Sequence, residues 1–250
     1  HNQSSFEGSV INRANPAEFS FNTALLYDDR HRIVFDRLLD CQTFDLYIST
    51  QSDDVWKLEK CVIQDGTFEI NKSRPLRLAV SGEASKLSKY TGTIPGNDFT
   101  YPAPTYVVPH IVTLTLGSDD IKDGVVGLSV ELQNDISWNN YNTIQGALSA
   151  TNAATSMYPS NFTIGTRVLA GSISKYLKDT STSVLTWNDN AALRMVVQHL
   201  PAGGRGLDFN ITNCSFTNRL STPDVFREEF NWRMTQNPTA LSSVITYQTG

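Results

Sequence analysis

The stretch VTLTLGSDDIKDGVVGLSVELQNDISW, residues 112–138, carries the pattern that decides the fold class. Apolar side chains alternate with small or polar ones in VTLTL and again in VGLSVEL. A period of two places alternate side chains on opposite faces of a β-strand. Gly and Asp, which favour turns, fill residues 117–124 between the two runs. The stretch therefore predicts an antiparallel hairpin with one buried face.

The same alternation recurs along the chain and predicts a mainly β protein. Strands are expected over 19–25, 43–50, 56–64, 67–70, 76–82, 106–116, 125–138, 166–177, 193–200, 207–216 and 225–234. A short amphipathic helix is expected over 33–39, and a short helix or turn over 183–190. Asp65-Gly66 is a turn signal. The aperiodic stretches 85–105 and 139–160 are expected to be long loops.

Composition excludes several classes of protein. The 250 residues are enough for one large domain or two smaller ones. Charged residues make up only 18%, and 20 basic against 25 acidic residues leave a net charge of −5. That balance, without any long Lys/Arg cluster, argues against high-affinity nucleic-acid binding. The apolar runs are also too short to span a bilayer as a helix.

An internal repeat divides the chain. Strand, helix, strand and Cys-containing strand follow one another over 19–63, and the same order returns over 168–216. Cys61 and Cys214 occupy matching places in the two series. We therefore predict a first repeat at 1–88, a linker at 89–104 and a second repeat at 105–250. The second repeat opens with the hairpin at 106–138, and the first is expected to lack its counterpart.

No arrangement of residues predicts an enzyme. The sequence contains no nucleophile elbow and no phosphate-binding loop, and its four histidines do not have the spacing of metal ligands. The three cysteines lack CxxC spacing and are expected to be small buried apolar side chains. We expect no catalytic residues, no cofactor-binding residues, no metal ligands and no cofactor.

Three local motifs have simpler interpretations than a functional site. Residues 203–206 (GGRG) have the composition of an anion-binding loop, but a flexible hairpin loop is favoured. Residues 118–124 resemble a calcium loop that lacks its terminal Glu, so a solvated turn is favoured. Glu228 and Glu229 are adjacent and should face opposite sides of a strand, which argues against a glycosidase pair. Packing is the favoured role of the four tryptophans: Trp56, Trp138, Trp187 and Trp232.

The order of these segments resembles the tail tube (major tail) proteins of long-tailed bacteriophages. The resemblance rests on 112–138, on the following loop, and on a G-x-R-x-x-x-G-S strand with Gly165, Arg167, Gly171 and Ser172. The segments NPAEFSFNTALL (15–26) and WKLEKCVIQ (56–64) resemble the first half of the double-domain variety found in siphophages. The chain departs from that pattern in lacking the first hairpin and an immunoglobulin-like domain.

The resemblance implies two tube folds, each a β-sandwich with a flanking helix. It also implies a non-enzymatic structural protein of the virion tail, assembled in the host cytoplasm. Three copies would form a pseudo-hexameric ring, and stacked rings would form the hollow tube through which DNA is ejected. The implied partners are the protein itself and tape measure, terminator and baseplate proteins. DNA would pass without specific binding, and no membrane would be involved.

The alternative to a tube protein is a surface or secreted β-sandwich adhesin or carbohydrate-binding module. If long strands join subunits through open edges, a proline at Val130 should block assembly without unfolding the remainder of the protein.

Overall fold

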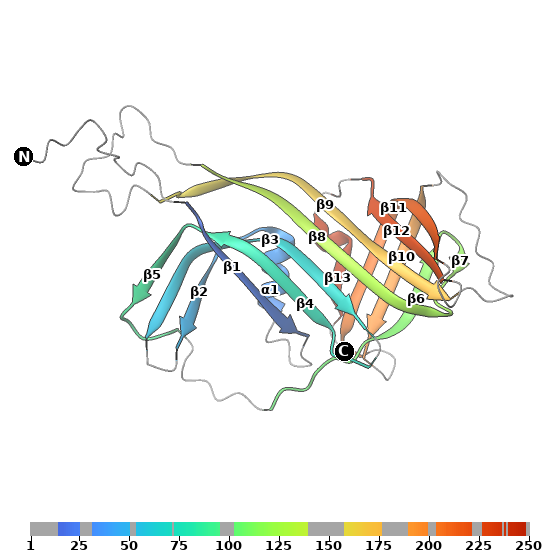
Figure 1. The fold of residues 1–250 in the computed structure, drawn as a ribbon, viewed down its shortest axis with the longest axis horizontal. Helices are drawn as coiled ribbons and strands as arrows, with labels where there is room; N and C mark the ends of the chain where they lie inside the picture. The colour runs from blue at the N-terminus through green and yellow to red at the C-terminus, as the bar shows by residue number, and fades with distance from the viewer. Residues whose placement is uncertain are drawn as a thin grey trace, which may run out of the picture.

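The structure is a computed structural model that describes residues 15–25, 32–50, 54–71, 73–95, 103–139, 158–176, 190–199, 204–221, 227–236, 238 and 240–248. Strands dominate it, as the alternating sequence predicts (Figure 1). The elements in chain order are β1 (Ala17–Ala24), α1 (Arg32–Asp40), β2 (Phe44–Ser49), β3 (Val55–Ile70), β4 (Arg77–Ala84), β5 (Lys86–Tyr90), β6 (His110–Leu116), β7 (Asp119–Asp120), β8 (Val125–Asn139), β9 (Asn161–Tyr176), β10 (Ala191–Gln198), β11 (Gly206–Ser221), β12 (Arg227–Met234), η2 (Leu241–Ser243) and β13 (Ile245–Gln248).

A single 13-stranded antiparallel sheet connects the strands in the order β1-β4-β3-β8-β9-β12-β11-β10-β6-β7. Outside this path, β2 and β5 pair with β3, and β13 pairs with β11. The sheet curls back on itself and thereby brings Phe68 of β3 against Phe209 of β11, although three strands separate β3 from β11 in the sheet. The two ring centroids are 5.6 Å apart. The buried side chains of both layers therefore form one core.

Helix α1 lies on the inner face of this curled sheet. Its buried side chains are Phe35, Leu38 and Leu39. Phe35 contacts Phe68 on one layer and Tyr247 of β13 on the other, with ring centroids 5.9 and 5.8 Å apart. The predicted helix over 33–39 is thus confirmed, and its apolar stripe fills the space between the layers.

The turn predicted at Asp65-Gly66 is wrong. β3 runs unbroken from Val55 to Ile70, and its register against β4 shifts between Ile63 and Asp65. Gly66 is required by packing, since a Cβ atom there would lie 2.3 Å from Cδ2 of Leu38. A glycine needed for close approach of a helix has the same sequence signature as a glycine in a turn.

The hairpin predicted over 112–138 is wrong, because its two strands form but do not pair with each other: β6 pairs with β10 and β7, and β8 pairs with β3 and β9. The remaining differences lie in the loops. Residues 86–90, expected to be part of a loop, form β5, because this segment continues the pairing of β4 along β3. β13 and η2 were not predicted. The helix or turn expected at 183–190 lies almost entirely outside the described residues, as does most of 139–160.

Two groups of strands share one connectivity. The order β1-β4-β3-β2 in the first half of the chain matches β9-β12-β11-β10 in the second. Cys61 pairs with Phe44 and Cys214 with Ala191, and in each strand pair the register shifts at the following position. β5 and β13 also correspond, since each extends the pairing on one side of the long strand, next to β4 and β12 respectively.

Candidate assembly surfaces

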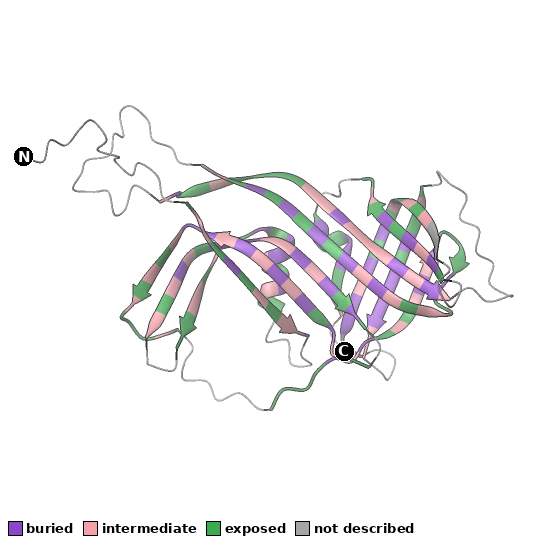
Figure 2. Ribbon diagram, viewed as in Figure 1, coloured by how far each residue is buried: buried purple, intermediate pink, exposed green. Residues whose placement is uncertain are grey.

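One face of the sheet is polar from β1 across to β11. Along β4, β8 and β12, buried side chains alternate with exposed or half-buried ones (Figure 2). The strand registers place the outward side chains in rows. One row joins Ser20, Ser81, Asp65 and Gln133. Serine hydroxyls bond along these rows, with Ser81 Oγ donating to Asp65 at 3.1 Å and the Ser129 and Ser172 hydroxyls 2.9 Å apart.

Acidic groups outnumber basic ones on this polar face, among the residues whose side chains are described. The acidic residues include Glu18, Asp65, Glu69, Glu83, Glu131, Asp135 and Glu229, and the basic residues include Arg77, Arg227 and Arg233. Glu69 lies opposite Arg77, and Arg227 lies over the ring of Tyr176 at 5.3 Å. The face therefore carries a negative excess that repels polyanions at long range.

Arg167 and Asn134 join the second half of the chain to α1. Arg167 donates from Nη2 to the carbonyl of Leu39 at 2.6 Å and from Nε to Oδ1 of Asn134 at 2.7 Å. Asn134 is buried and donates from Nδ2 to the carbonyls of Leu38 and Ile63, both at 3.2 Å. The bonds to Leu38 and Leu39 satisfy carbonyls that the helix leaves free at its C-terminus, where a positive charge is also favourable.

The sequence indicated Arg167 only as part of a motif, and it did not indicate Asn134. Asn134 could have been recognised as a polar residue at an inward position, because it follows the buried Leu128, Val130 and Leu132 of β8 at the same two-residue spacing. A polar side chain at an inward position needs hydrogen-bond partners, but the amino-acid sequence does not show which residues these partners are.

Several strands pair on one side only within the described part of the chain, among them β1, β2, β5, β7 and β13, and part of β11 is open as well. β1 pairs with β4 on one side only. β11 pairs with β10 over 206–214, and no described residue pairs with that side of the strand over 215–221. β3 provides the contrast, because β2 occupies that side over 55–61 and β8 occupies it over 65–70. Open edges of this kind expose unpaired peptide groups to another chain.

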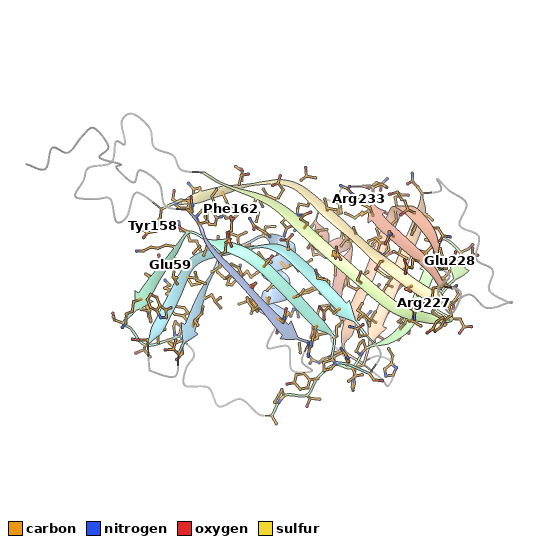
Figure 3. The ribbon with its side chains drawn as sticks, in the orientation of Figure 1. Glu59, Tyr158, Phe162, Arg227, Glu228 and Arg233 are labelled. Atoms are coloured by element: carbon orange, nitrogen blue, oxygen red, sulfur yellow. The ribbon has the colours of Figure 1, made fainter. Side chains whose placement is uncertain are left out.

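The three strands β2, β3 and β5 form a narrower extension of the sheet. Leu87, Ile48 and Trp56 on its apolar face are exposed. The chain enters β9 beside this extension: Ser85 donates its hydroxyl to the carbonyl of Pro159, and Lys86 lies over the ring of Tyr158 at 5.3 Å. Glu59 and Tyr158 accordingly lie at the opposite end of the molecule from Arg227 and Glu228 (Figure 3).

Among the described residues, none of these three motifs forms a binding or catalytic site. Lys122 bonds Asp120 through Nζ at 2.9 Å and through its N–H at 3.1 Å, so this aspartate of the 118–124 turn is already paired. Glu228 is buried and accepts a hydrogen bond from Asn218 at 2.7 Å, while Glu229 lies on the polar face, as predicted for adjacent strand residues. In the 203–206 loop the described Gly206 already begins β11.

No group of three His, Cys, Asp or Glu side chains in the described ranges is placed to hold a metal ion. No helix among them is long and apolar enough to cross a membrane. Trp232 is buried and Trp138 is half-buried against Phe162, while Trp56 is exposed and Trp187 lies outside the described residues.

The three cysteines are buried and free, as predicted. Burial raises the pKa of the Cys61 and Cys214 thiols to about 12, since a thiolate would lose its hydration. Burial likewise raises the pKa of Cys41. Cys41 has a φ of 50° and follows α1, so a cysteine occupies the left-handed position that usually ends a helix with glycine.

Comparison with known proteins adds one finding. No curated protein sequence matches the chain. The profile of the Bacteriophage Baseplate Tube Protein Family matches residues 28–248, most of its length. The resemblance to phage tail proteins is confirmed at this level, and the match names the baseplate tube where the sequence resemblance named the major tail tube. A mainly β chain with a polar sheet face and open edges thus belongs to the Bacteriophage Baseplate Tube Protein Family and is a structural component of the phage tail.

Proposed function

We propose that this protein forms rings that stack into a hollow tube at or within the phage tail, and that DNA passes through the tube during ejection. The observation that carries the proposal is the repeated strand connectivity within one continuous sheet, one face of which is polar and acidic. If each chain contributes two copies of one unit, three chains can close into a ring of six units.

The polar face of the sheet is the surface proposed to line the lumen. Its hydroxyl and carboxylate groups are stable in water, and its negative excess repels the phosphate backbone, so that DNA slides past without being held. The opposite face is filled by α1 and the shared core and cannot line a channel.

The finer features of the proposal follow the resemblance to double-domain tube proteins. They are two repeats at 1–88 and 105–250 joined by a linker at 89–104, three copies in a pseudo-hexameric ring, and assembly in the host cytoplasm. The partners would be further copies and the tape measure, terminator and baseplate proteins of the tail. The same ring could form part of the major tail tube of a siphophage or part of its baseplate tube.

Electron microscopy of the purified protein, combined with native mass measurement, tests the proposal. We expect rings with threefold symmetry, a central channel and the mass of three 27.7 kDa chains. A protein that stays monomeric at every concentration and salt condition, or that forms only closed twofold dimers, would overturn it.

A further inference from the structure

Each half of the chain contains a three-stranded unit with the same pairing, made of β2, β3 and β5 in the first half and of β10, β11 and β13 in the second. In the first unit Ile48 lies opposite Trp56, and in the second Met195 lies opposite Phe209. Trp56 and Phe209 each lie five residues before the matching cysteine of their strand. The two units therefore have equivalent apolar faces.

The apolar face of the second unit is buried by the first half of the same chain. Phe209 and Met195 are both 0% exposed. The ring of Phe209 contacts that of Phe68 near the end of β3, with centroids 5.6 Å apart. Tyr247 of β13 contacts Phe35 of α1, with ring centroids 5.8 Å apart. This face is therefore covered by the long strand and the helix of the other half.

The equivalent face of the first unit has no such cover among the described residues. Trp56 is 39% exposed, Ile48 44% and Leu87 48%. Leu87 lies opposite Leu58, which is two residues from Trp56 and is buried, so the apolar surface runs without a break from the core to the exposed side chains. A contiguous exposed apolar surface of this kind marks a site of interaction with another protein.

The other face of the first unit is polar and forms its interactions within the unit. Lys57 bonds Asp45 at 2.9 Å and lies over the ring of Tyr47 at 5.7 Å. The ring of Tyr47 in turn contacts that of Tyr90, with centroids 5.0 Å apart. Burial in a complex would therefore gain hydrophobic free energy on the apolar face and little on the polar one.

We propose that the apolar face of the first unit, with Ile48, Trp56 and Leu87, docks on the second half of another copy of this chain, near the end of its β11. This inference rests on the proposed function and names the side chains that one contact between copies buries. By the strand registers, the end of β11 at 215–221 corresponds to the end of β3 that covers Phe209 within the chain. The two docking surfaces differ, so the contact is head-to-tail and can close into a ring.

Substitution of two exposed isoleucines tests the contact. Ile48→Asp places a charge on the apolar face, and Ile33→Asp makes the same change on the exposed side of α1. Because both side chains are exposed in the single chain, we expect both variants to keep the circular dichroism spectrum and thermal midpoint of the wild type. Ile48→Asp should lose at least tenfold in association constant by analytical ultracentrifugation, since its carboxylate would be buried without a partner. A folded Ile48→Asp protein that assembles like Ile33→Asp would overturn the inference.

Maleimide labelling of an introduced cysteine identifies what covers the face. Leu87→Cys places a thiol on it, Ile33→Cys is the control, and the three native cysteines are buried. We expect Leu87→Cys to react rapidly in the dilute monomer and at least tenfold more slowly in assembled rings, and Ile33→Cys to react equally fast in both.

Two results of the labelling would overturn the inference and leave the proposed function standing. Slow reaction of Leu87→Cys in the monomer would mean that another segment of the same chain covers the face. Fast reaction in assembled rings would mean that no copy covers it. A wild-type protein that forms no rings would overturn both the inference and the proposed function.

Discussion

Gly171 lies on the inward side of β9, where the ring of Trp232 and the backbone of β8 leave no room for a side chain. A Cβ atom would lie 2.1 Å from the carbonyl oxygen of Ser129 and 2.6 Å from Trp232 Cζ2. We expect Gly171→Ala to lower the free energy of unfolding by about 1–3 kcal/mol, as overpacking does in a dense core. Urea denaturation measures the change. Gly127→Ala is the control, because its new Cβ would meet only Ser174 at 3.7 Å, and equal losses in both variants would contradict the prediction.

Arg167 should matter through its contacts with α1 more than through its charge. Arg167→Ala leaves the carbonyl of Leu39 and the buried Oδ1 of Asn134 without this donor, at a cost of about 2–4 kcal/mol. Arg167→Lys keeps the charge but cannot reproduce both bonds, so it should lie between wild type and alanine. Chemical denaturation ranks the three proteins. A lysine variant as stable as wild type would show that charge alone is sufficient.

The buried cysteines predict a fall in stability at high pH. The thiols of Cys61 and Cys214 have a pKa of about 12 in the folded protein, against 9.0 as the ordinary value. The folded state therefore holds protons that the unfolded chain releases, and this contribution to stability is complete below pH 9 and is lost as the pH rises toward 12. Cys214→Ala should flatten the decline of unfolding free energy over that range. An unchanged slope would mean that this thiol does not contribute.

At the scale of elements, β8 is internal to the sheet, and the expectation for Val130 was wrong. Val130 is buried and lies between Phe68 of β3 and Gly171 of β9, so its strand is paired on both sides. We now expect Val130→Pro to prevent folding, because proline removes a ladder bond inside a central strand. Circular dichroism and solubility measure this, with Val130→Ala as the control. A folded Val130→Pro protein that fails only to assemble would restore the earlier expectation.

Elements with strong local patterns could be predicted from the sequence, and those made by long-range pairing could not. The alternation in VGLSVEL and the apolar stripe of α1 arise from neighbours within the same segment, and both elements were located correctly. β5 and β13 have little pattern of their own, because each is held by pairing with the side of a long strand. The contacts of Asn134 and Arg167 with α1 likewise bring together residues about 100 or more positions apart.

At the scale of the whole molecule, the charge of the polar face is testable in the assembled protein. Glu131→Lys places a positive charge among the acidic groups of that face, and Asp36→Lys makes the same change on α1, away from it. We expect assembled Glu131→Lys rings to retain DNA in a gel-shift experiment at low salt, and Asp36→Lys rings to behave like wild type. Equal retention by both variants would show that only net charge matters and would argue against this face as the lumen.

The hydrogen bonds between β3 and β8 also affect how assembly depends on concentration. Because both strands belong to one chain, their junction forms during folding at an effective concentration set by the connecting segment. A ring in which each chain contributes two repeats then has half of its junctions already made before any two molecules meet. Only the other junctions form between separate molecules, and only their formation costs translational and rotational entropy. Such a ring should persist at dilutions at which a ring with the same number of separate single-repeat subunits would dissociate.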